Sequence, residues 1–178
     1  VVLRKMSRSE VEDLVARVDA GVCELANYNT PAQYVVSGEM AALDQVIEMA
    51  GERKAMRLPV SVPFHCSMLS AAAREFGELL DAVEMNDPAC PVDCAVDAVK
   101  VTTADAARDA LKRQFAGAVR WEGSVRRILQ DDDIRQFAEC GPKPTLLRMV
   151  TQVANAVGVE GLELYAATTA DEVESLQV

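Results

Sequence analysis

Long apolar runs, basic residues and histidine are scarce in this 178-residue chain, and each scarcity argues against a class of protein or of site. No run of about eighteen apolar residues occurs, and no stretch has the charged, apolar and small-residue layout of a signal peptide, so we expect no membrane segment. Acidic residues outnumber basic ones by 28 to 18, and the net charge of -10 argues against nucleic-acid binding. Hydrophobic residues still make up 50% of the chain, which is enough for a folded core.

Cysteine is present, but in no arrangement that indicates a metal site or a disulfide framework. The five cysteines are irregularly spaced, and Cys90 and Cys94 lack the two-residue gap of zinc knuckles and redox pairs. With one histidine in the chain, a zinc site would need nearly all the thiols to converge. We therefore predict no metal and interpret the thiols as buried and reduced, which is typical of a cytoplasmic protein.

The first sixty residues follow the order strand, helix, strand, strand, helix, strand. Ser7 and Glu10 fit a capping box, in which a hydroxyl and a carboxylate satisfy free backbone N–H groups at a helix start. Gly21 is expected to end that helix. The other elements are expected at residues 1–4, 22–28, 33–37, 40–50 and 55–59. This order predicts a ferredoxin-like βαββαβ subdomain over residues 1–60.

Residues 61–178 show a different alternation. The predicted elements are a helix at 68–83, a strand at 91–96, helices at 103–115 and 121–130, a strand at 134–138, a helix at 145–157, a strand at 162–167 and a frayed tail. Such alternation indicates an open, mostly parallel α/β layer, so the fold class is α/β with an α+β part. Two or three strands make a poor parallel sheet alone, and this part looks incomplete. Because the first residue is Val rather than Met, we expect a processed or partial chain.

The only histidine, His65, lies in the segment Leu58–Leu69, between a predicted strand and a predicted helix. Pro59 and Pro63 restrict the backbone on this approach, because each fixes its own φ and favours extended geometry in the residue before it. His65 can therefore be exposed and yet held in one direction. A lone histidine can equally be a hydrogen-bonded structural residue, so the surrounding sequence has to decide between the two.

Five separated motifs stand in order along the chain. They are Asn27–Gly38 (NYNTPAQYVVSG), Leu58–His65 (LPVSVPFH), Leu111–Phe115 (LKRQF), Val119–Trp121 (VRW) and Glu139–Pro142 (ECGP). Together they resemble the malonyl-CoA:acyl-carrier-protein transacylases, over nearly all of this chain but only the C-terminal portion of the family's length. The resemblance implies a ferredoxin-like subdomain inserted into a hydrolase-like α/β subdomain, whose C-terminal part is residues 61–178, with the active site in the cleft between them. The GPKP sequence at 141–144 departs from the family's usual G-P-G-K.

The family's nucleophilic serine has no counterpart in these 178 residues. That serine stands in a G-H-S-x-G turn, and no G-x-S-x-G sequence occurs here. The family's acyl-carboxylate-binding arginine and oxyanion-hole glutamine would also lie upstream of Val1, so we expect a missing N-terminal catalytic segment, supplied in cis or in trans. Cys66 is a poor alternative nucleophile, because neighbours in a chain rarely present their side chains to each other.

The resemblance implies transfer of a malonyl group from coenzyme A to the phosphopantetheine thiol of acyl carrier protein, through an acyl-serine and with no further cofactor. His65 would be the general base and acid, since imidazole titrates near working pH, and the backbone carbonyl of Gln114 would orient its ring. Phe64 would favour malonyl over methylmalonyl groups, by roughly 1–3 kcal/mol for one methyl. Asn27 and Asn29 would face the cleft. Core packing for Phe64 and turn chemistry for the asparagines are the alternative interpretations.

Two other functions fit the same sequence. Because the chain contains no serine elbow, it could be a non-catalytic module that docks a carrier protein. It could also be the acyltransferase part of a polyketide synthase or a malonate decarboxylase, with the same chemistry and a different acceptor.

Overall fold

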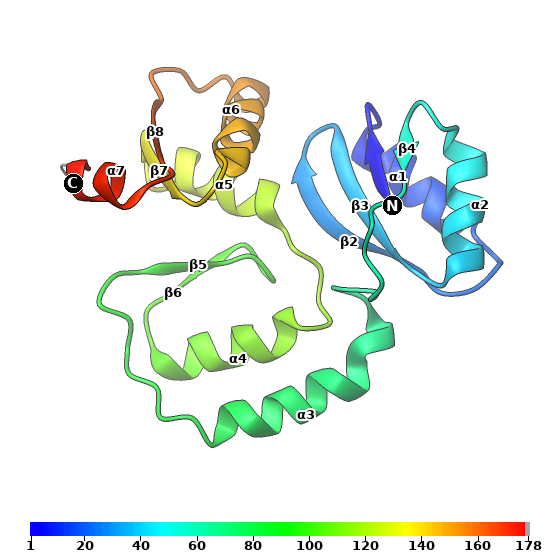
Figure 1. Ribbon diagram of the computed structural model, residues 1–178, viewed down its shortest axis with the longest axis horizontal. Helices are drawn as coiled ribbons and strands as arrows, with labels where there is room; N and C mark the ends of the chain where they lie inside the picture. The colour runs from blue at the N-terminus through cyan, green and yellow to red at the C-terminus, as the bar shows by residue number, and fades with distance from the viewer. Residues whose placement is uncertain (177–178) are drawn as a thin grey trace. The chain divides into compact units, whose positions relative to one another are not determined.

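The computed structural model describes residues 1–176, and its internal contacts divide the chain into two compact units, Val1–Ser124 and Val125–Val178 (Figure 1). The division falls within helix α5 (Trp121–Gln130), whose bounds match the predicted helix. The predicted subdomain boundary after residue 60 follows the order of the predicted strands and helices rather than these contacts, and it stays a prediction.

The first unit begins with a four-stranded antiparallel sheet and two helices. Its elements are β1 (Val2–Arg4), α1 (Arg8–Ala16), β2 (Cys23–Thr30), β3 (Gln33–Gly38), α2 (Met40–Ala50) and β4 (Ala55–Met56). The strand order is β2-β3-β1-β4, with β1 paired antiparallel to both β3 and β4. The predicted βαββαβ ferredoxin-like arrangement is therefore confirmed.

Local sequence accounts for the start of α1 and for the core beneath it. The Ser7 hydroxyl accepts from the backbone N–H of Glu10, and the Glu10 carboxylate accepts from the backbone N–H of Ser7, which is the predicted capping box. Apolar residues from both helices and from the sheet then form one buried cluster, as the helical and strand periodicities require. It contains Val1, Leu3, Met6, Val11, Leu14, Tyr34, Val36, Leu43, Val46 and Ala55.

Two predicted boundaries in this subdomain were wrong. Helix α1 ends at Ala16 rather than at Gly21, because the backbone N–H groups of Asp19 and Ala20 both donate to the Gln45 side chain of α2. This contact between distant residues replaces further helical turns. Strand β4 covers only Ala55–Met56 rather than residues 55–59, and the chain then runs to residue 66 without regular structure.

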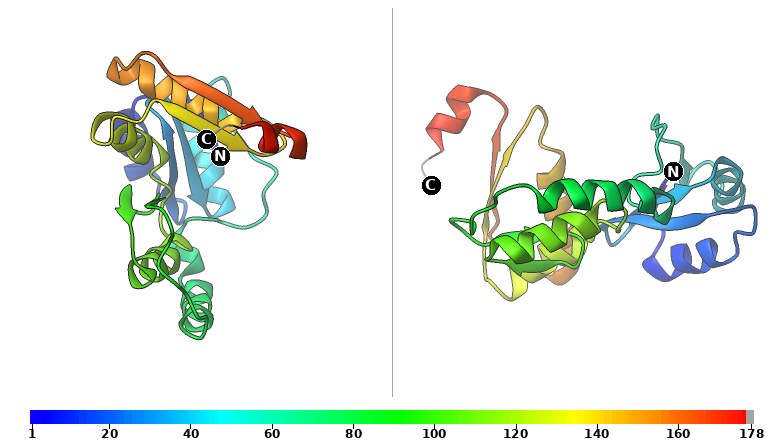
Figure 2. Two further views of the ribbon diagram at one scale, coloured as in Figure 1. Left: turned by 90° about the vertical axis from the view of Figure 1, so that its left-hand side faces the viewer. Right: turned by 90° about the horizontal axis from the view of Figure 1, so that it is seen from below.

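The rest of the first unit contains a helix pair. The 3-10 turn η1 (Ser67–Leu69) leads into α3 (Ser70–Asp81), and α3 lies beside α4 (Ala104–Gln114) in Figures 1 and 2. The rings of Phe76 and Phe115 join the pair with centroids 5.0 Å apart. The Arg108 guanidinium donates to the backbone oxygen of Val83 at 2.8 Å, which ties α4 to the end of α3.

The predicted strand near residues 91–96 does not belong to a parallel layer. It is β5 (Val92–Cys94), which pairs antiparallel with β6 (Val99–Val101), a strand that we did not predict. The connecting turn places Ala98 at a φ of +57°. Alanine seldom adopts that left-handed conformation, so the sequence carries no glycine or asparagine signal for the hairpin.

The second unit contains the one parallel strand pair in the described residues. Strand β7 (Gln136–Cys140) pairs parallel with β8 (Glu163–Ala167), and α6 (Thr145–Val157) connects them. The buried residues of α6 are Leu147, Val150, Val153 and Ala154. Gly158 ends α6 in the left-handed conformation, at a φ of +71°.

The predicted frayed tail was also wrong, because residues Ala170–Ser175 form helix α7. Thr169 and Glu172 make a second capping box at its start, with the same chemistry as the one at α1. Across residues 1–176 no helix is long and apolar enough to cross a bilayer; α6, the longest, has 13 residues.

Candidate active site

His65 lies in the irregular segment between β4 and η1, and its own backbone is strained. Its φ is +57°, in the left-handed region that few residues other than glycine adopt. Such conformations cost free energy and persist only where surrounding contacts enforce them, which is why they concentrate at functional sites. The side chain is half-buried. Contacts around this strained turn therefore hold the His65 ring in place.

One of those contacts fixes the tautomer of the ring. His65 Nδ1 lies 3.1 Å from the backbone oxygen of Gln114. A carbonyl oxygen can only accept, so Nδ1 donates in this hydrogen bond. In a neutral imidazole the other nitrogen, Nε2, then carries the lone pair and is the basic atom.

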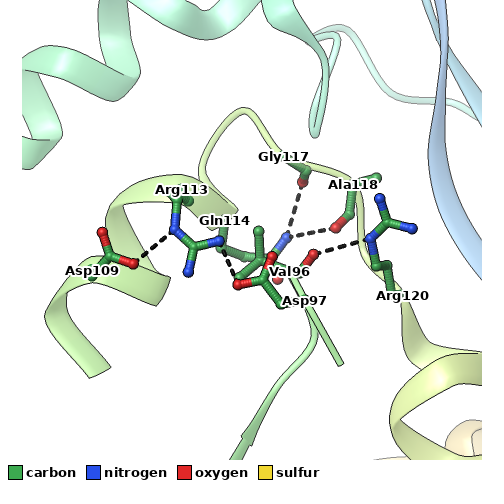
Figure 3. Close-up of polar contacts among 8 residues, drawn as sticks. All are labelled: Val96, Asp97, Asp109, Arg113, Gln114, Gly117, Ala118 and Arg120. Atoms are coloured by element: carbon green, nitrogen blue, oxygen red, sulfur yellow. Dashed lines mark hydrogen bonds and ion pairs between the residues drawn. The ribbon is translucent and has the colours of Figure 1, made fainter. Parts of the chain in front are cut away.

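The Gln114 carbonyl is itself held in place by the loop that follows α4 (Figure 3). The Gln114 side-chain amide donates to the backbone oxygens of Gly117, at 2.9 Å, and Ala118, at 3.4 Å. The neighbouring Arg113 pairs with Asp97 at 2.5 Å and with Asp109 at 2.8 Å. Gln114 thus contributes both the acceptor for His65 and the bonds that shape the acceptor's loop.

The same loop continues onto the edge of the ferredoxin-like sheet. The backbone N–H of Tyr28 donates to the oxygen of Val119 at 2.8 Å, and the N–H of Val119 donates to the oxygen of Ala26 at 2.8 Å. These bonds bracket Asn27, where the pairing of β2 with β3 shifts register. A register shift of this kind redirects a side chain, and such irregularities are common beside active sites.

A cavity of about 630 Å³ brings three of the predicted site residues together. His65, Phe64 and Asn27 all line it, along with residues at the end of β3, the start of α2 and the 57–63 segment. Gln114 reaches the site through its carbonyl rather than by lining the cavity. Asn29 does not line the cavity and lies within β2, one residue before its last.

Sequence reasoning missed one polar group that contacts the residues just after His65, the carboxylate of Glu24. It accepts from the backbone N–H of Ser67 at 2.8 Å and from the Ser67 hydroxyl. Burial opposes ionisation of this carboxyl, but the hydrogen bonds from Ser67 and from the Cys66 thiol outweigh it, so the pKa of Glu24 is lowered. The available signal was the one charged residue in the strand sequence of β2, Cys23–Thr30.

Cysteine chemistry contributes little to this site. Cys66, next to His65, is fully buried, and burial raises the pKa of its thiol, which disfavours the reactive thiolate. Within the described part of the chain, no three His, Cys, Asp or Glu side chains are grouped so that they could hold a metal ion.

No protein-family model matches the chain. Individual proteins do resemble it: the malonyl CoA-acyl carrier protein transacylase of Escherichia coli K12 is 32% identical over 147 residues, which are 81% of this chain and 47% of that protein. The transacylase of Bacillus subtilis is also 32% identical over 147 residues, 81% of this chain and 46% of that protein. Over 81% of its length the chain is thus homologous to malonyl-CoA:acyl-carrier-protein transacylases. It spans about half the length of the curated family members that it matches.

Solved structures of malonyl-CoA:acyl-carrier-protein transacylases agree with this chain in fold. The acyl-carrier-protein S-malonyltransferase of Burkholderia pseudomallei matches 99% of this chain with a TM-score of 0.88 and 31% identity, over 57% of its own chain. A malonyl-transacylase solved in complex with a type II polyketide-synthase acyl-carrier protein matches with the same TM-score, 0.88, and 27% identity. The family resemblance carried by the motifs and the α/β fold class predicted from the alternation of helices and strands are both confirmed.

Proposed function

We propose that the chain is part of an acyltransferase that moves a malonyl group from coenzyme A to the phosphopantetheine thiol of acyl carrier protein, through an acyl-serine intermediate. The reaction would serve fatty acid synthesis in the cytoplasm and need no further cofactor. One observation carries the proposal: His65 lines a cavity, and its Nδ1 is hydrogen-bonded to the Gln114 oxygen.

In this proposal, His65 Nε2 takes the proton from the serine hydroxyl as it attacks the malonyl thioester, and returns it to the departing thiol. In the second half reaction the same nitrogen takes the proton of the carrier-protein thiol and returns it to the serine. The serine belongs to a G-H-S-x-G segment outside these 178 residues, in cis or in trans. Positioned proton transfer of this kind contributes roughly 10²–10⁴-fold to the rate.

Substrate discrimination would come from the walls of the cavity. Phe64 lines it and is 53% exposed, so its ring can limit the space beside the acyl group without being part of the core. Asn27 lines it from the sheet side and offers an amide for a polar atom of the substrate. Asn29 does not line the cavity, so it would affect the substrate only by way of the position of β2.

The test compares the 178-residue chain alone with the same chain joined to a segment that carries the G-H-S-x-G serine. We expect no malonyl transfer to acyl carrier protein from the chain alone and measurable transfer from the joined protein. A joined protein whose serine is replaced by alanine is the control and should be inactive. Transfer by the isolated chain would contradict the proposal that these residues supply the base and another segment supplies the serine.

A second function, a non-catalytic module that docks acyl carrier protein, is favoured by the lack of a serine elbow in the sequence. Titration of the complete gene product with acyl carrier protein separates the two functions. Micromolar binding without turnover would favour the docking module, whereas turnover would exclude it. Comparing fatty-acid and polyketide-synthase carrier proteins in the transfer assay identifies the acceptor, and free malonate as a substrate tests the decarboxylase alternative.

A further inference from the structure

The strained turn that carries His65 is attached to the rest of the first unit at two points. The ring is bonded to the Gln114 oxygen, and two residues further along Ser67 is bonded to Glu24. Between them, the side chain of Cys66 is fully buried. Glu24 lies 43 residues before Ser67 in the chain and comes from β2, so this second attachment connects the turn to the ferredoxin-like sheet.

Glu24 supplies the hydrogen-bond acceptor for the first N–H of η1, which is normally supplied by the residue that precedes a helical turn. The residue preceding η1 is Cys66, and its side chain makes no capping hydrogen bond to the turn. Serine, threonine, aspartate or asparagine would normally satisfy the first free N–H groups at such a point. Here the N–H of Ser67 is satisfied by the Glu24 carboxylate at 2.8 Å, and the Ser67 hydroxyl donates to the other oxygen of the same carboxylate.

We propose that Glu24 is a positioning residue for the transfer reaction, holding Ser67 so that the strained backbone of His65 keeps its ring on the Gln114 carbonyl. The inference rests on the proposed function of His65 as the base. Its own support is structural. His65 has a left-handed φ of +57°, and its ring makes one hydrogen bond, to the Gln114 oxygen. The Glu24 carboxylate accepts from both the N–H and the hydroxyl of Ser67. Without the carboxylate, the turn loses the contact that offsets its strain.

The chain offers a direct readout, because His65 is its only histidine. A sample labelled with ¹⁵N-histidine gives one set of ring signals, whose chemical shifts report which nitrogen carries the proton. In the wild-type chain we expect a single Nδ1-protonated form. In Glu24→Ala we expect a mixture of the two neutral tautomers, and in Glu24→Gln, which keeps one acceptor oxygen, a spectrum close to wild type.

Glu10 provides a matched control. Its carboxylate accepts from the N–H of Ser7 at 2.6 Å and from the Ser7 hydroxyl at 2.8 Å, the same pair of contacts made at the start of α1. Glu10→Ala therefore removes equivalent hydrogen bonds away from the candidate site and should leave the His65 ring signals unchanged. If Glu24→Ala fails to fold, Ser67→Ala removes only the hydroxyl donor and should shift the tautomer mixture in the same direction.

The activity arm uses the joined protein. Glu24→Ala should lower kcat by roughly 10- to 100-fold with KM unchanged, because a displaced base impairs the chemical step and not binding. Glu24→Gln should restore most of the loss. If folded Glu24→Ala kept wild-type ring signals and a wild-type kcat, and His65→Ala was inactive, the positioning role of Glu24 would be overturned and the proposed function would stand. Full activity in His65→Ala would instead overturn the proposed function on which the inference rests.

Discussion

The ring of His65 is held by an atom that every residue possesses: its Nδ1 lies 3.1 Å from the backbone oxygen of Gln114, 49 residues further along the chain. The identity of residue 114 therefore matters less for accepting this hydrogen bond than for shaping the loop that presents the carbonyl. The Gln114 side chain has that second task, through its bonds to the oxygens of Gly117 and Ala118.

Replacing Gln114 with alanine separates these two tasks. The carbonyl remains, but both side-chain hydrogen bonds are lost, so we expect a destabilisation of about 1–3 kcal/mol at about 0.5–1.5 kcal/mol for each bond. The transfer rate should fall by less than it does in His65→Ala. Urea unfolding and steady-state transfer by the joined protein measure the two effects. Gln152→Ala, on an exposed position of α6, is the control and should change stability by less than about 0.5 kcal/mol. A loss of activity in Gln114→Ala as large as that in His65→Ala would show that the carbonyl is not independently held.

Replacing Phe64 with serine should relax the choice of acyl group. The ring is 53% exposed, so the substitution removes little core packing while enlarging the cavity. We expect the ratio of kcat/KM for methylmalonyl-CoA to that for malonyl-CoA to rise by roughly 10- to 200-fold, the range that one methyl group commands in a pocket. An unchanged ratio in a folded variant would indicate that Phe64 does not contact the acyl group.

Two glycines should respond in opposite directions to alanine. A Cβ at Gly38 would overlap the backbone oxygen of Val22, so Gly38→Ala must push apart backbone at the junction of β3 and α2, at a cost of about 1–3 kcal/mol. A Cβ at Gly77, inside α3, would meet only the Lys112 side chain at 3.6 Å. Gly77→Ala should therefore stabilise the chain by about 0.5–1 kcal/mol, because alanine is the better helix former. Thermal unfolding of the two variants checks both signs, and destabilisation by Gly77→Ala would contradict the packing of α3 on α4.

The thiol of Cys23 should be slow to alkylate at neutral pH. Burial raises the pKa of this thiol to about 11, so at pH 8 only about one molecule in a thousand carries the reactive thiolate. In the unfolded chain, with a pKa of about 8.5, roughly a quarter of the molecules do. We expect the alkylation rate of Cys23, followed by mass spectrometry, to rise about tenfold for each pH unit up to about pH 10 in the folded chain. A rate that levels off near pH 9 would show that the thiol is not buried.

The ferredoxin-like part could be predicted from sequence because its signals are local. Apolar periodicity, the Ser7 capping box and the short turn between β2 and β3 all lie within a few residues of what they determine. The failures needed information from elsewhere in the fold. Gln45 of α2 ends α1, and the β5–β6 hairpin turns on an alanine at a φ of +57°. Helix α7 is different, since its capping box at Thr169 was readable and was missed.

The residues of the candidate site also separate into those that local sequence indicates and those that only the folded structure reveals. His65 stood out because it is the only histidine and closely follows two prolines, Pro59 and Pro63, and the family motifs suggested Gln114, Phe64 and Asn27. No local pattern could reveal that His65 has a left-handed backbone. Nor could one reveal that Glu24, 43 residues from Ser67, accepts the hydrogen bond from the Ser67 N–H at the start of η1. Strain and long-range hydrogen bonds arise from the assembled structure, and for this reason sequence patterns record them poorly.

The central claim is that His65 is the base of the transfer reaction, and its substitution tests that claim most directly. The measurement is the rate of malonyl transfer from coenzyme A to acyl carrier protein by the chain joined to a serine-bearing segment, with and without His65→Ala. We predict a fall of roughly 10²–10⁴-fold with the fold intact by circular dichroism. Transfer at the unsubstituted rate by a folded His65→Ala protein would contradict the account.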